Sequence, residues 1–424
     1  MKLLCISNGH GEDAIALPVL QELRKLAKSS EIVALPIVGV GNAYRDHDFP
    51  IAGKVQIMPS GGFLNQDNRQ LARDLQGGLV GLTIDQIRTI RHWGKSGGKI
   101  LAVGDIVPLL FAWLSGAEYA FIGTAKSEYY LRDRQGQILP SQRNSIEAKT
   151  GSVYFPWERW LLSRRNCQAV FARDQLTAEI LQQWRIPAFD LGNPMTDGVA
   201  TDPSQLGFDR PQTFKRGLAR SLIITLLPGS RPPEAYANWH QIVIAVNSLI
   251  PVFPHRQILC LAAIVPTLDL NEIECHLCEL GWMKLVEIEA DLTNFIPDVS
   301  TIYYRHQNVT IAISTKSGRE FMQLGDWAIA MAGTATEQFI SLGKPALIIP
   351  GAGPQFTPAF AEAQTRLLGE SVILVPQPQN VGVEIQQLLQ QPDRLRSIAQ
   401  NGLLRMGMPG AARRIAECSI EIMS

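Results

Sequence analysis

The chain has 424 residues, of which 46% are hydrophobic and 18% charged, and its 39 basic and 39 acidic side chains give a formal net charge of zero. This length exceeds one ordinary α/β unit and predicts two or more domains. A neutral chain has no overall electrostatic attraction for nucleic acid, so we expect no nucleic-acid partner.

The cysteines and the apolar stretches indicate a cytoplasmic protein. The six cysteines are scattered, which is typical of a reducing compartment. Cys275 and Cys278 form a lone C-x-x-C pair with no second pair nearby, so we expect two helix cysteines rather than a metal or redox site. The chain opens directly on a predicted strand, without a signal peptide, and its most apolar stretch, 100–124, is interrupted by charged residues and proline. We therefore expect no membrane span.

Short apolar strands alternate with helical segments in the first half of the chain. The expected strands are 2–7, 32–38, 100–103, 119–122, 169–171 and 188–191, and the expected helices are 14–27 and 175–184. We expect a loop at 8–13, a less regular stretch at 60–98 and a long irregular excursion at 124–160.

The alternation restarts after the polar stretch 196–219, which we interpret as a linker. The expected strands are 222–227, 257–261, 301–304, 309–313, 327–331, 346–349 and 372–375, and the expected helices are 235–249, 269–280, 319–324, 337–342 and 360–368. This pattern predicts an α/β protein with parallel sheets in two Rossmann-like halves, 1–197 and 198–405, and a ligand between them at the carboxyl ends of the strands.

The most informative motif is the sequence Leu-Leu-Pro-Gly-Ser-Arg at 226–231. A buried strand runs into a Gly-containing turn, and a helix is expected to begin near the two prolines that follow. Such a junction directs free backbone N–H groups at an anion, typically a phosphate, and Arg231 adds a forked cation. Gly229, Ser230 and Arg231 are therefore our predicted diphosphate site. The alternative is a surface arginine that pairs with Glu234.

A second junction, Met-Ala-Gly-Thr-Ala-Thr-Glu at 331–337, repeats this arrangement about a hundred residues later. Two phosphate-type junctions in one half indicate a ligand that contains a diphosphate, such as a sugar nucleotide. The alternative is a tight strand-to-helix turn in which threonine serves as a cap.

Four motifs in order resemble those of lipid-A-disaccharide synthase, and most closely a related group of cyanobacterial type. They are Gly-Asn-Pro-Met-Thr-Asp at 192–197, the 226–231 motif with Glu234, Gly-Arg-Glu-Phe-Met at 318–322, and Ala-Gly-Thr-Ala-Thr-Glu at 332–337. The likeness covers the whole second half. In the first half it covers the opening strand with its Gly-rich loop and the turn at 103–105.

The resemblance implies a GT-B glycosyltransferase, in which two Rossmann-like domains face a central cleft and the last helix, 406–424, crosses back to the first domain. It implies that a hexose is transferred with inversion from a UDP-sugar, without a metal or other cofactor. The acceptor would be lipid-linked or amphiphilic, as in glycolipid biosynthesis, and would reach the first domain at a membrane surface. A homodimer is also expected. The acceptor-side loops differ from the synthase pattern, so the donor class follows more directly than the acceptor.

An inverting transfer needs a base for the acceptor hydroxyl and groups that stabilise the leaving UDP. Asp105 ends the strand 100–103 at the position of the synthase's catalytic aspartate, and His10 lies in a Gly-flanked loop after the first strand. Both are candidates for the base. Asp105 could instead cap the next helix, and His10 could bond a neighbouring turn. The acceptor-side loop is expected to comprise Asn8, Gly9, Gly11, Glu12 and Asp13 around His10.

The donor site is expected to extend beyond the two junctions. Glu337 would accept hydrogen bonds from the ribose, as this motif does in related enzymes, or would be a first-turn acid favoured by the helix dipole. Gln355 follows the strand 346–349 and would read donor hydroxyls. The expected donor-binding residues are Gly229, Ser230, Arg231, Gly333, Thr334, Ala335, Thr336, Glu337 and Gln355.

The region 130–165 is locally basic and carries Trp157 and Trp160, which suits contact with anionic lipid head groups. The alternative is a solvated loop whose arginines pair with Glu147 and Glu158. Phe111, Trp113 and Leu114 fit either a core helix face or part of an exposed apolar patch.

Two other functions fit the same fold. One is a UDP-sugar 2-epimerase, which would need a second acid–base pair that the sequence does not make evident. The other is a non-catalytic protein that binds a nucleotide sugar or a lipid. Because function resides in the site rather than the fold, these alternatives stay open at the level of sequence.

Overall fold

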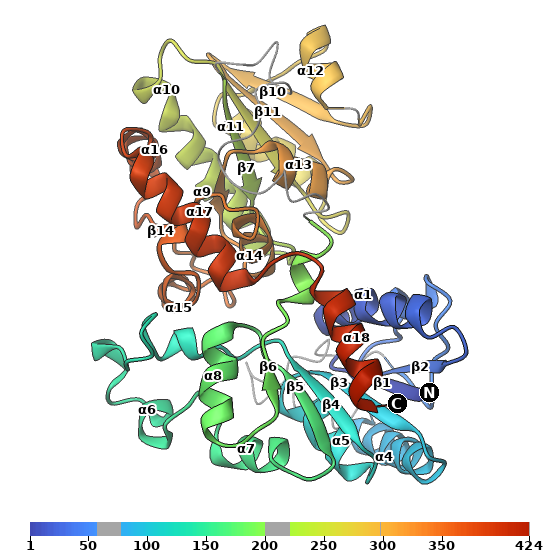
Figure 1. Cartoon of the computed structure of the whole chain (residues 1–424). Coiled ribbons are helices and arrows are strands. Elements are labelled where there is room, and N and C mark those ends of the chain that lie inside the picture. Colours follow the sequence, from blue (N-terminus) through green and yellow to red (C-terminus); the bar gives the residue numbers. More distant parts are fainter. Residues whose placement is uncertain (57–77, 200–220, 297, 424) are drawn as a thin grey trace. The chain divides into compact units, whose positions relative to one another are not determined.

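The chain forms two compact units, which we describe separately (Figure 1). The computed structural model describes residues 1–56, 78–199, 221–296 and 298–423. Unit 1 comprises Met1–Asp197 and Gly407–Ser424, and unit 2 comprises Gly198–Met406. Most of the predicted linker, from residue 200 onward, lies outside the described residues.

Unit 1 contains a six-stranded sheet in the order β2-β1-β3-β4-β5-β6, and all its strand pairs are parallel. The strands are β1 (Lys2–Ser7), β2 (Glu31–Pro36), β3 (Lys99–Gly104), β4 (Tyr119–Gly123), β5 (Cys167–Phe171) and β6 (Ala188–Phe189). Their nearly continuous apolar sequences reflect a sheet that is buried on both faces.

The helices of unit 1 cover both faces of this sheet. They are α1 (His10–Leu26), α2 (Asn42–Arg45), α4 (Leu79–Lys95), α5 (Ile106–Leu114), α6 (Ile146–Thr150), α7 (Pro156–Leu162), α8 (Gln175–Gln183) and α18 (Ala411–Met423). One core contains side chains of α4, α5, α7 and α8, and a second core contains side chains of α1 and α18. The expectation of irregular structure is wrong for 79–95, which forms a regular helix.

Helix α18 brings the end of the chain back into unit 1, where it lies beside α1 (Figure 1). Its apolar side chains, including Ile415 and Met423, pack in the same core as those of β1 and β3. The Asp197 carboxylate holds its start and accepts hydrogen bonds from the backbone N–H groups of Gly410 (2.7 Å) and Ala412 (2.6 Å). The acidic side chain at this N-terminus is therefore a cap supplied by the end of the first segment of unit 1.

Unit 2 contains an eight-stranded sheet in the order β14-β13-β12-β7-β8-β11-β10-β9. The strands are β7 (Leu222–Leu227), β8 (Ile258–Ala263), β9 (Met283–Lys284), β10 (Ile302–His306), β11 (Val309–Ser314), β12 (Trp327–Ala330), β13 (Ala346–Ile348) and β14 (Val372–Leu374). The expectation of purely parallel sheets is wrong at β10, which is antiparallel to β11 and β9. Only Gln307 and Asn308 join β10 to β11, and a parallel crossover needs a much longer connection.

Nine helices of the described part of unit 2 surround this sheet. They are α9 (Glu234–Asn247), α10 (Leu249–Val252), α11 (Leu270–Glu279), α12 (Ala290–Phe295), α13 (Gly318–Leu324), α14 (Thr334–Ile340), α15 (Pro358–Leu368), α16 (Val381–Leu389) and α17 (Pro392–Met406). Trp239, Trp327 and Phe321 fill the core. Cys275 and Cys278 are free and exposed on α11. None of the helices described in either unit is long and apolar enough to cross a bilayer.

Candidate functional site

The two predicted phosphate junctions of unit 2 follow strands that pair with each other. The strands β8 to β11 follow β7 in the sequence and lie on one side of it in the sheet. The next strand, β12, pairs with the other side of β7. The strand order therefore reverses between β7 and β12, with Leu227 opposite Ala330. In open α/β sheets, ligands bind outside the carboxyl ends of strands at such a reversal. Residues 228–231 and 331–336 extend from these two strand ends.

Buried amide side chains hold these two connections together. Asn238 of α9 donates hydrogen bonds from Nδ2 to the carbonyl oxygens of Pro228 (3.1 Å) and Met331 (3.3 Å). Gln364 of α15 donates to the carbonyl of Ala332 at 3.2 Å. Gly229 has a φ of 97°, and a Cβ at this position would lie 3.4 Å from the Met331 carbonyl oxygen. The connections thus form one cross-bonded edge, in which Asn238 and Gln364 play parts that the sequence did not reveal.

Glu234 is buried at the start of α9 and organises a third connection. Its carboxylate accepts hydrogen bonds from the backbone N–H groups of Phe356 (2.6 Å) and Gln355 (3.3 Å). At Gly353 a Cβ would lie 2.3 Å from the Glu234 side chain, so only glycine permits this approach. The predicted pairing of Glu234 with Arg231 is therefore incomplete, because the carboxylate mainly anchors the loop that carries Gln355.

Arg231 lies at this edge with an exposed side chain. Partial burial lowers the pKa of its guanidinium, and the negative charge of Glu234 opposes that shift. An arginine beside free backbone N–H groups can hold two oxygens of a phosphate in a bidentate geometry. Gly229 and Ser230 precede it in the same turn.

The second junction differs in detail from the sequence-based expectation. Helix α14 begins at Thr334 rather than at Glu337, so Thr334, Ala335, Thr336 and Glu337 form its first turn after Gly333. The Thr336 hydroxyl is buried and donates to the carbonyl of Ala332 at 2.6 Å. That bond stabilises the turn, but the alternative interpretation of threonine as a cap is wrong, because the N-cap is Gly333 and no side chain makes a cap hydrogen bond there. Thr334 is exposed, while Glu337 is buried.

Unit 1 has an equivalent reversal between β1 and β3. The chain passes from β1 to β2 on one side and returns to place β3 on the other side of β1, with Ser7 opposite Val103. The two connections that follow contain Asn8 and Gly9 after β1, and Asp105 after β3. The sheet therefore brings both predicted catalytic segments to neighbouring strand ends.

The predicted loop at 8–13 is much shorter than expected. Helix α1 begins at His10, and the N–H groups of Glu12 and Asp13 donate to the Gly9 carbonyl at 2.9 and 3.2 Å. Gly9 makes this sharp start possible because its φ is 123°. His10, Gly11, Glu12 and Asp13 are thus first-turn residues, in which acidic side chains complement the helix dipole. The His10 side chain lies outside the described part of the structure.

The acidic side chains at this edge have different environments. Asp105 is half-buried and caps α5, since its Oδ1 accepts from the backbone N–H of Val107 at 2.8 Å. Burial raises the pKa of the Glu12 carboxyl, and the charges of Asp105 and Asp13 raise it further. Asp13 is buried and accepts from the Ser7 hydroxyl at 2.5 Å, so it serves the core more than a ligand. Glu12 and Asp105 remain as the interacting carboxyl groups of the site.

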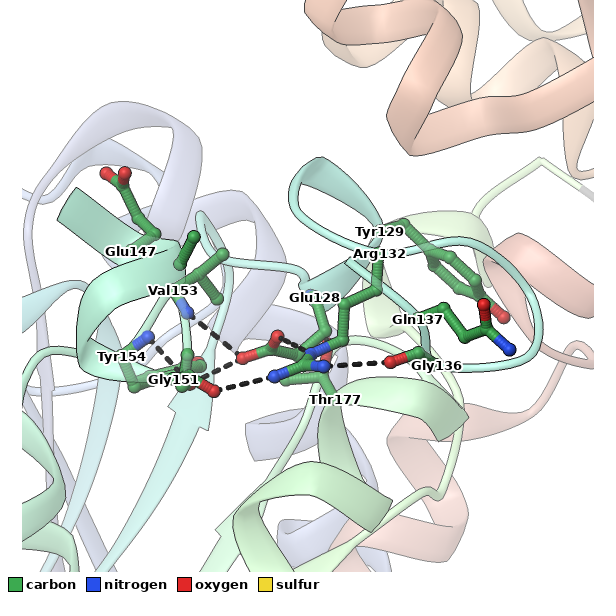
Figure 2. A network of polar contacts seen from close by, with 12 residues as sticks. Glu128, Tyr129, Arg132, Gly136, Gln137, Glu147, Gly151, Val153, Tyr154 and Thr177 are labelled. Atoms are coloured by element: carbon green, nitrogen blue, oxygen red, sulfur yellow. Dashed lines mark hydrogen bonds and ion pairs between the residues drawn. The ribbon is translucent and has the colours of Figure 1, made fainter. Parts of the chain in front are cut away.

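The excursion at 124–160 is anchored by a buried ion pair (Figure 2). The Glu128 carboxylate contacts Arg132 at 2.9 Å and accepts from the N–H of Val153 at 3.0 Å. Arg132 also donates to the carbonyl oxygens of Gly136 (2.8 Å) and Gly151 (2.7 Å). The expectation of a solvated basic loop is therefore wrong for Arg132, which links separate parts of the excursion to one another.

Three tryptophans, two at the end of this excursion and one on α5, are exposed. Trp157 and Trp160 of α7 are 57% and 46% exposed, and Trp113 of α5 is 37% exposed. The rings of Trp113 and Trp160 meet edge to face, with centroids 5.4 Å apart, and the Arg164 guanidinium lies 4.3 Å from the centre of the Trp160 ring. We call Trp113, Trp157 and Trp160 the tryptophan patch. Its position on neighbouring helices resolves the sequence-based choice for Trp113 in favour of an exposed patch.

No family model and no curated protein matches the chain, so the resemblance to lipid-A-disaccharide synthase has no support at the level of sequence. Solved structures with a similar fold include a putative UDP-N-acetylglucosamine 2-epimerase from Listeria monocytogenes, at 14% identity and a TM-score of 0.56 over 99% of this chain and 95% of that one. The glycotransferase of kitacinnamycin matches at 12% identity and a TM-score of 0.54, over 100% and 99%. MnaA from S. aureus, solved with UDP, matches at 14% identity and a TM-score of 0.52, over 99% and 96%.

The chain has the GT-B fold. The predicted fold class, α/β with two Rossmann-like domains, is confirmed by the two sheets and by these likenesses. At such low identity the likenesses establish the fold alone. They do not distinguish a transferase from an epimerase. Among the described residues, no group of three or more histidine, cysteine or acidic side chains has the geometry of a metal site.

Proposed function

We propose that the protein is a cytoplasmic glycosyltransferase that moves a hexose from a UDP-sugar to a lipid-linked or amphiphilic acceptor, with inversion. The observation that carries the proposal is the convergence of the 228–231 and 331–336 connections at the strand reversal of unit 2. Solved structures of the same fold include one named for a UDP-sugar and one that holds UDP. A diphosphate is the ligand chemistry that two such connections and Arg231 suit.

In this proposal unit 2 holds the donor and unit 1 supplies the base. Arg231 and the backbone N–H groups near Gly229 and Ser230 stabilise the charge that develops on the leaving UDP. Asp105 takes the proton of the acceptor hydroxyl, with His10 as the alternative base. No metal is required, because an arginine and backbone dipoles neutralise the leaving group. Glu337 and Gln355 would contact the ribose and the sugar of the donor, and the protein would act as a homodimer.

Replacing Arg231 by alanine is expected to weaken UDP binding by about 10- to 100-fold, because charge-assisted hydrogen bonds contribute about 1.5–3 kcal/mol. Titration calorimetry with UDP, ADP and GDP would measure both the loss and the preference for uridine. The control is Arg305→Ala, which removes an arginine that pairs with Glu289 at 2.8 Å on β10. Equal UDP affinity in the wild type and in Arg231→Ala would remove this arginine from the donor site, and absence of nucleotide binding would remove the proposal.

A UDP-sugar 2-epimerase is the second candidate, since the structural likenesses include a protein named for that activity. The two reactions differ in their products. A transferase releases UDP in proportion to a glycosylated acceptor, whereas an epimerase converts the UDP-sugar without an acceptor. Proton NMR of a purified UDP-sugar incubated with the protein alone would show a second sugar isomer for the epimerase. A non-catalytic binding protein would give neither product, although UDP would bind.

The tryptophan patch supports the amphiphilic acceptor in this proposal. Exposed indole rings next to Arg164 fit the interface of a bilayer that carries anionic lipids. Replacing Trp157 and Trp160 together by serine is expected to lower binding to phosphatidylglycerol vesicles about tenfold or more, as measured by sedimentation, because each buried ring contributes about 1.5–3 kcal/mol. The control replaces the exposed Met283 and Val286 of unit 2 by serine. Equal binding of both double variants would contradict membrane contact by the patch.

A further inference from the structure

Buried polar atoms with unmet hydrogen bonds gather at the carboxyl ends of β4 and β5 in unit 1. The hydroxyl of Tyr154, Oγ1 of Thr124 and Oδ2 of Asp174 are shielded from solvent and have no hydrogen-bond partner among the described residues. Tyr154 is 2% exposed and Asp174 is 3% exposed. Buried polar groups are almost always bonded, so three such atoms in one region indicate that a group enters to bond them.

These atoms adjoin the strand end that carries the proposed base. The Tyr154 hydroxyl packs against Gly123, the last residue of β4, where an added Cβ would lie only 2.4 Å from it. Thr124 comes next in the chain, and its N–H donates to the Gly104 carbonyl at 3.3 Å, one residue before Asp105. The region is thus the continuation, across β4, of the edge where Asp105 lies.

The residues that follow β5 contribute the remaining groups of the region. Arg173 follows β5 and donates from Nη1 to the Thr124 carbonyl at 2.8 Å. Asp174 comes next. Burial raises the pKa of the Tyr154 hydroxyl, and the negative charges of Glu158, Asp174 and Glu128 raise it further. The Tyr154 hydroxyl therefore stays protonated and can donate as well as accept a hydrogen bond.

The surrounding bonds fix the backbone and side chains that present these atoms. The Tyr154 N–H donates to Oγ of Ser152 at 3.0 Å, and the Ser152 hydroxyl donates to the Glu128 carboxylate, which pairs with Arg132 (Figure 2). Oδ1 of Asp174 accepts from the N–H of Thr177 at 2.9 Å and from its hydroxyl at 2.8 Å, so the α8 cap uses Oδ1, and Oδ2 has no hydrogen-bond partner among the described residues. The Asp174 side chain cannot turn without breaking its bonds to Thr177, and the bond of the Tyr154 N–H fixes the backbone that carries the buried Tyr154 ring.

The charges of the region balance. The acidic residues are Glu128, Glu158 and Asp174, and the basic residues are Lys126, Arg132 and Arg173. Lys126 pairs with Glu158 at 2.5 Å, and Arg132 pairs with Glu128. A balanced environment with two hydroxyls and one carboxylate oxygen suits an uncharged hydroxyl group, which donates one hydrogen bond and accepts others.

We propose that Thr124, Tyr154 and Asp174 form a subsite that binds an uncharged hydroxyl group of the acceptor, next to the hydroxyl that reacts. The assignment to the acceptor rests on the proposed function. Asp174 accepts a hydrogen bond from the bound hydroxyl, and Tyr154 and Thr124 donate to its oxygen. These residues then determine which acceptors are used, and Asp105 performs the proton transfer.

The first test uses the protein without any ligand. In Tyr154→Phe the melting temperature is expected to equal or exceed that of the wild type, because the lost hydroxyl has no partner to lose. Tyr44→Phe is the matched control, since the Tyr44 hydroxyl is equally buried but donates to Oγ of Ser7 at 2.7 Å, so its removal should lower the melting temperature. A decrease in Tyr154→Phe as large as in Tyr44→Phe would show that the hydroxyl is already bonded in the free protein and would overturn the proposal.

The second test uses methyl β-D-glucopyranoside at high concentration as a hydroxyl-rich probe in thermal unfolding. The expected result is a larger upward shift for the wild type and Tyr44→Phe than for Tyr154→Phe and Thr124→Ala. General stabilisation by an excluded sugar raises all four proteins alike and cancels in the comparison. Equal shifts in all four would overturn the subsite. UDP titration of the same samples separates the outcomes, because loss of UDP binding refutes the donor site, while unequal probe shifts still support the hydroxyl subsite.

Discussion

Replacing Arg132 by methionine is expected to lower the free energy of unfolding by about 3–5 kcal/mol, because removal of one partner leaves the other buried and uncompensated. The partner, Glu128, has a completely buried side chain, and the Arg132 side chain is only 14% exposed. The substitution also removes the donors to the Gly136 and Gly151 carbonyls. Urea unfolding followed by circular dichroism would measure the change.

A matched control separates loss of the buried pair from loss of any arginine. Arg413→Met removes an arginine in the same unit that pairs with Glu417 on the surface of α18 at 2.9 Å, and it should leave the unfolding midpoint close to that of the wild type. Similar midpoints for Arg132→Met and Arg413→Met would contradict the anchoring role of Glu128 and Arg132. In that case the excursion would be held by its other contacts, such as those of Tyr154 and Lys126.

The strands could be predicted from the sequence because parallel strands buried on both faces are nearly continuous apolar runs. The segments at 2–7 and 222–227 have this character, and both are strands with those bounds. The predicted starts of two helices lie too late in the chain. Helix α1 begins at His10 rather than residue 14, and α14 at Thr334 rather than residue 337. Glycine, threonine and aspartate have low helix propensity, yet they are tolerated in the first turn, where acidic side chains also complement the helix dipole.

The sequence does not predict helix α4, because Gly81 and Gly94 lie within it and glycine weakens the helical pattern that the buried Leu82 and Ile90 support. The sequence predicts both β10 and β11 as strands. Their antiparallel direction follows from the two-residue connection, which the predicted strand bounds, 301–304 and 309–313, do not reveal.

Some residues of the candidate site could also be predicted from the sequence, and others could not. Gly229, Ser230 and Arg231 carry a local signal, because a strand, a glycine turn and a helix are contiguous in the chain. Asn238 has no such signal, since it acts by bonding to Met331, 93 residues away. Glu128 likewise acts on Val153 and Thr177 through the fold. Local motifs therefore predict where a ligand site begins, and long-range polar bonds, which decide how rigid the site is, emerge only from the structure.

Replacing Asp105 by asparagine is expected to reduce turnover of the UDP-sugar by about 10²- to 10⁴-fold, the usual contribution of a general base. Asparagine retains an oxygen that can accept from the Val107 N–H, so the α5 cap and the stability should change little. Release of UDP with an active acceptor would measure the rate. An unchanged rate would exclude Asp105 as the base and leave His10, for which His10→Asn is the corresponding variant.

The Glu12 carboxyl is expected to make the rate of the reaction depend on pH. Burial and the charge of Asp105 raise its pKa above the ordinary value of 4.5, so on acidification Glu12 gains its proton earlier than an exposed glutamate does. Its negative charge is then lost from the site, and the rate of a reaction that uses this charge should fall at a pH above the ordinary carboxyl range. In Glu12→Gln this acid limb should move to lower pH, as measured by kcat/KM between about pH 4 and about pH 8. An acid limb that stays at the same pH would contradict the coupling.

Stability provides an independent check of the same environment. A carboxyl whose pKa is raised in the folded state favours folding below its unfolded pKa, and this contribution is lost as the pH rises through the folded pKa. The wild type should therefore lose some stability as the pH rises across the window above 4.5, and Glu12→Gln should lose less. If both proteins respond identically to pH, Glu12 does not sit in the buried, acidic environment that the proposed base requires. Glu12→Gln could change the pH dependence of stability and leave the pH dependence of kcat/KM unchanged. In that case Glu12 is buried, but it does not influence proton transfer by Asp105.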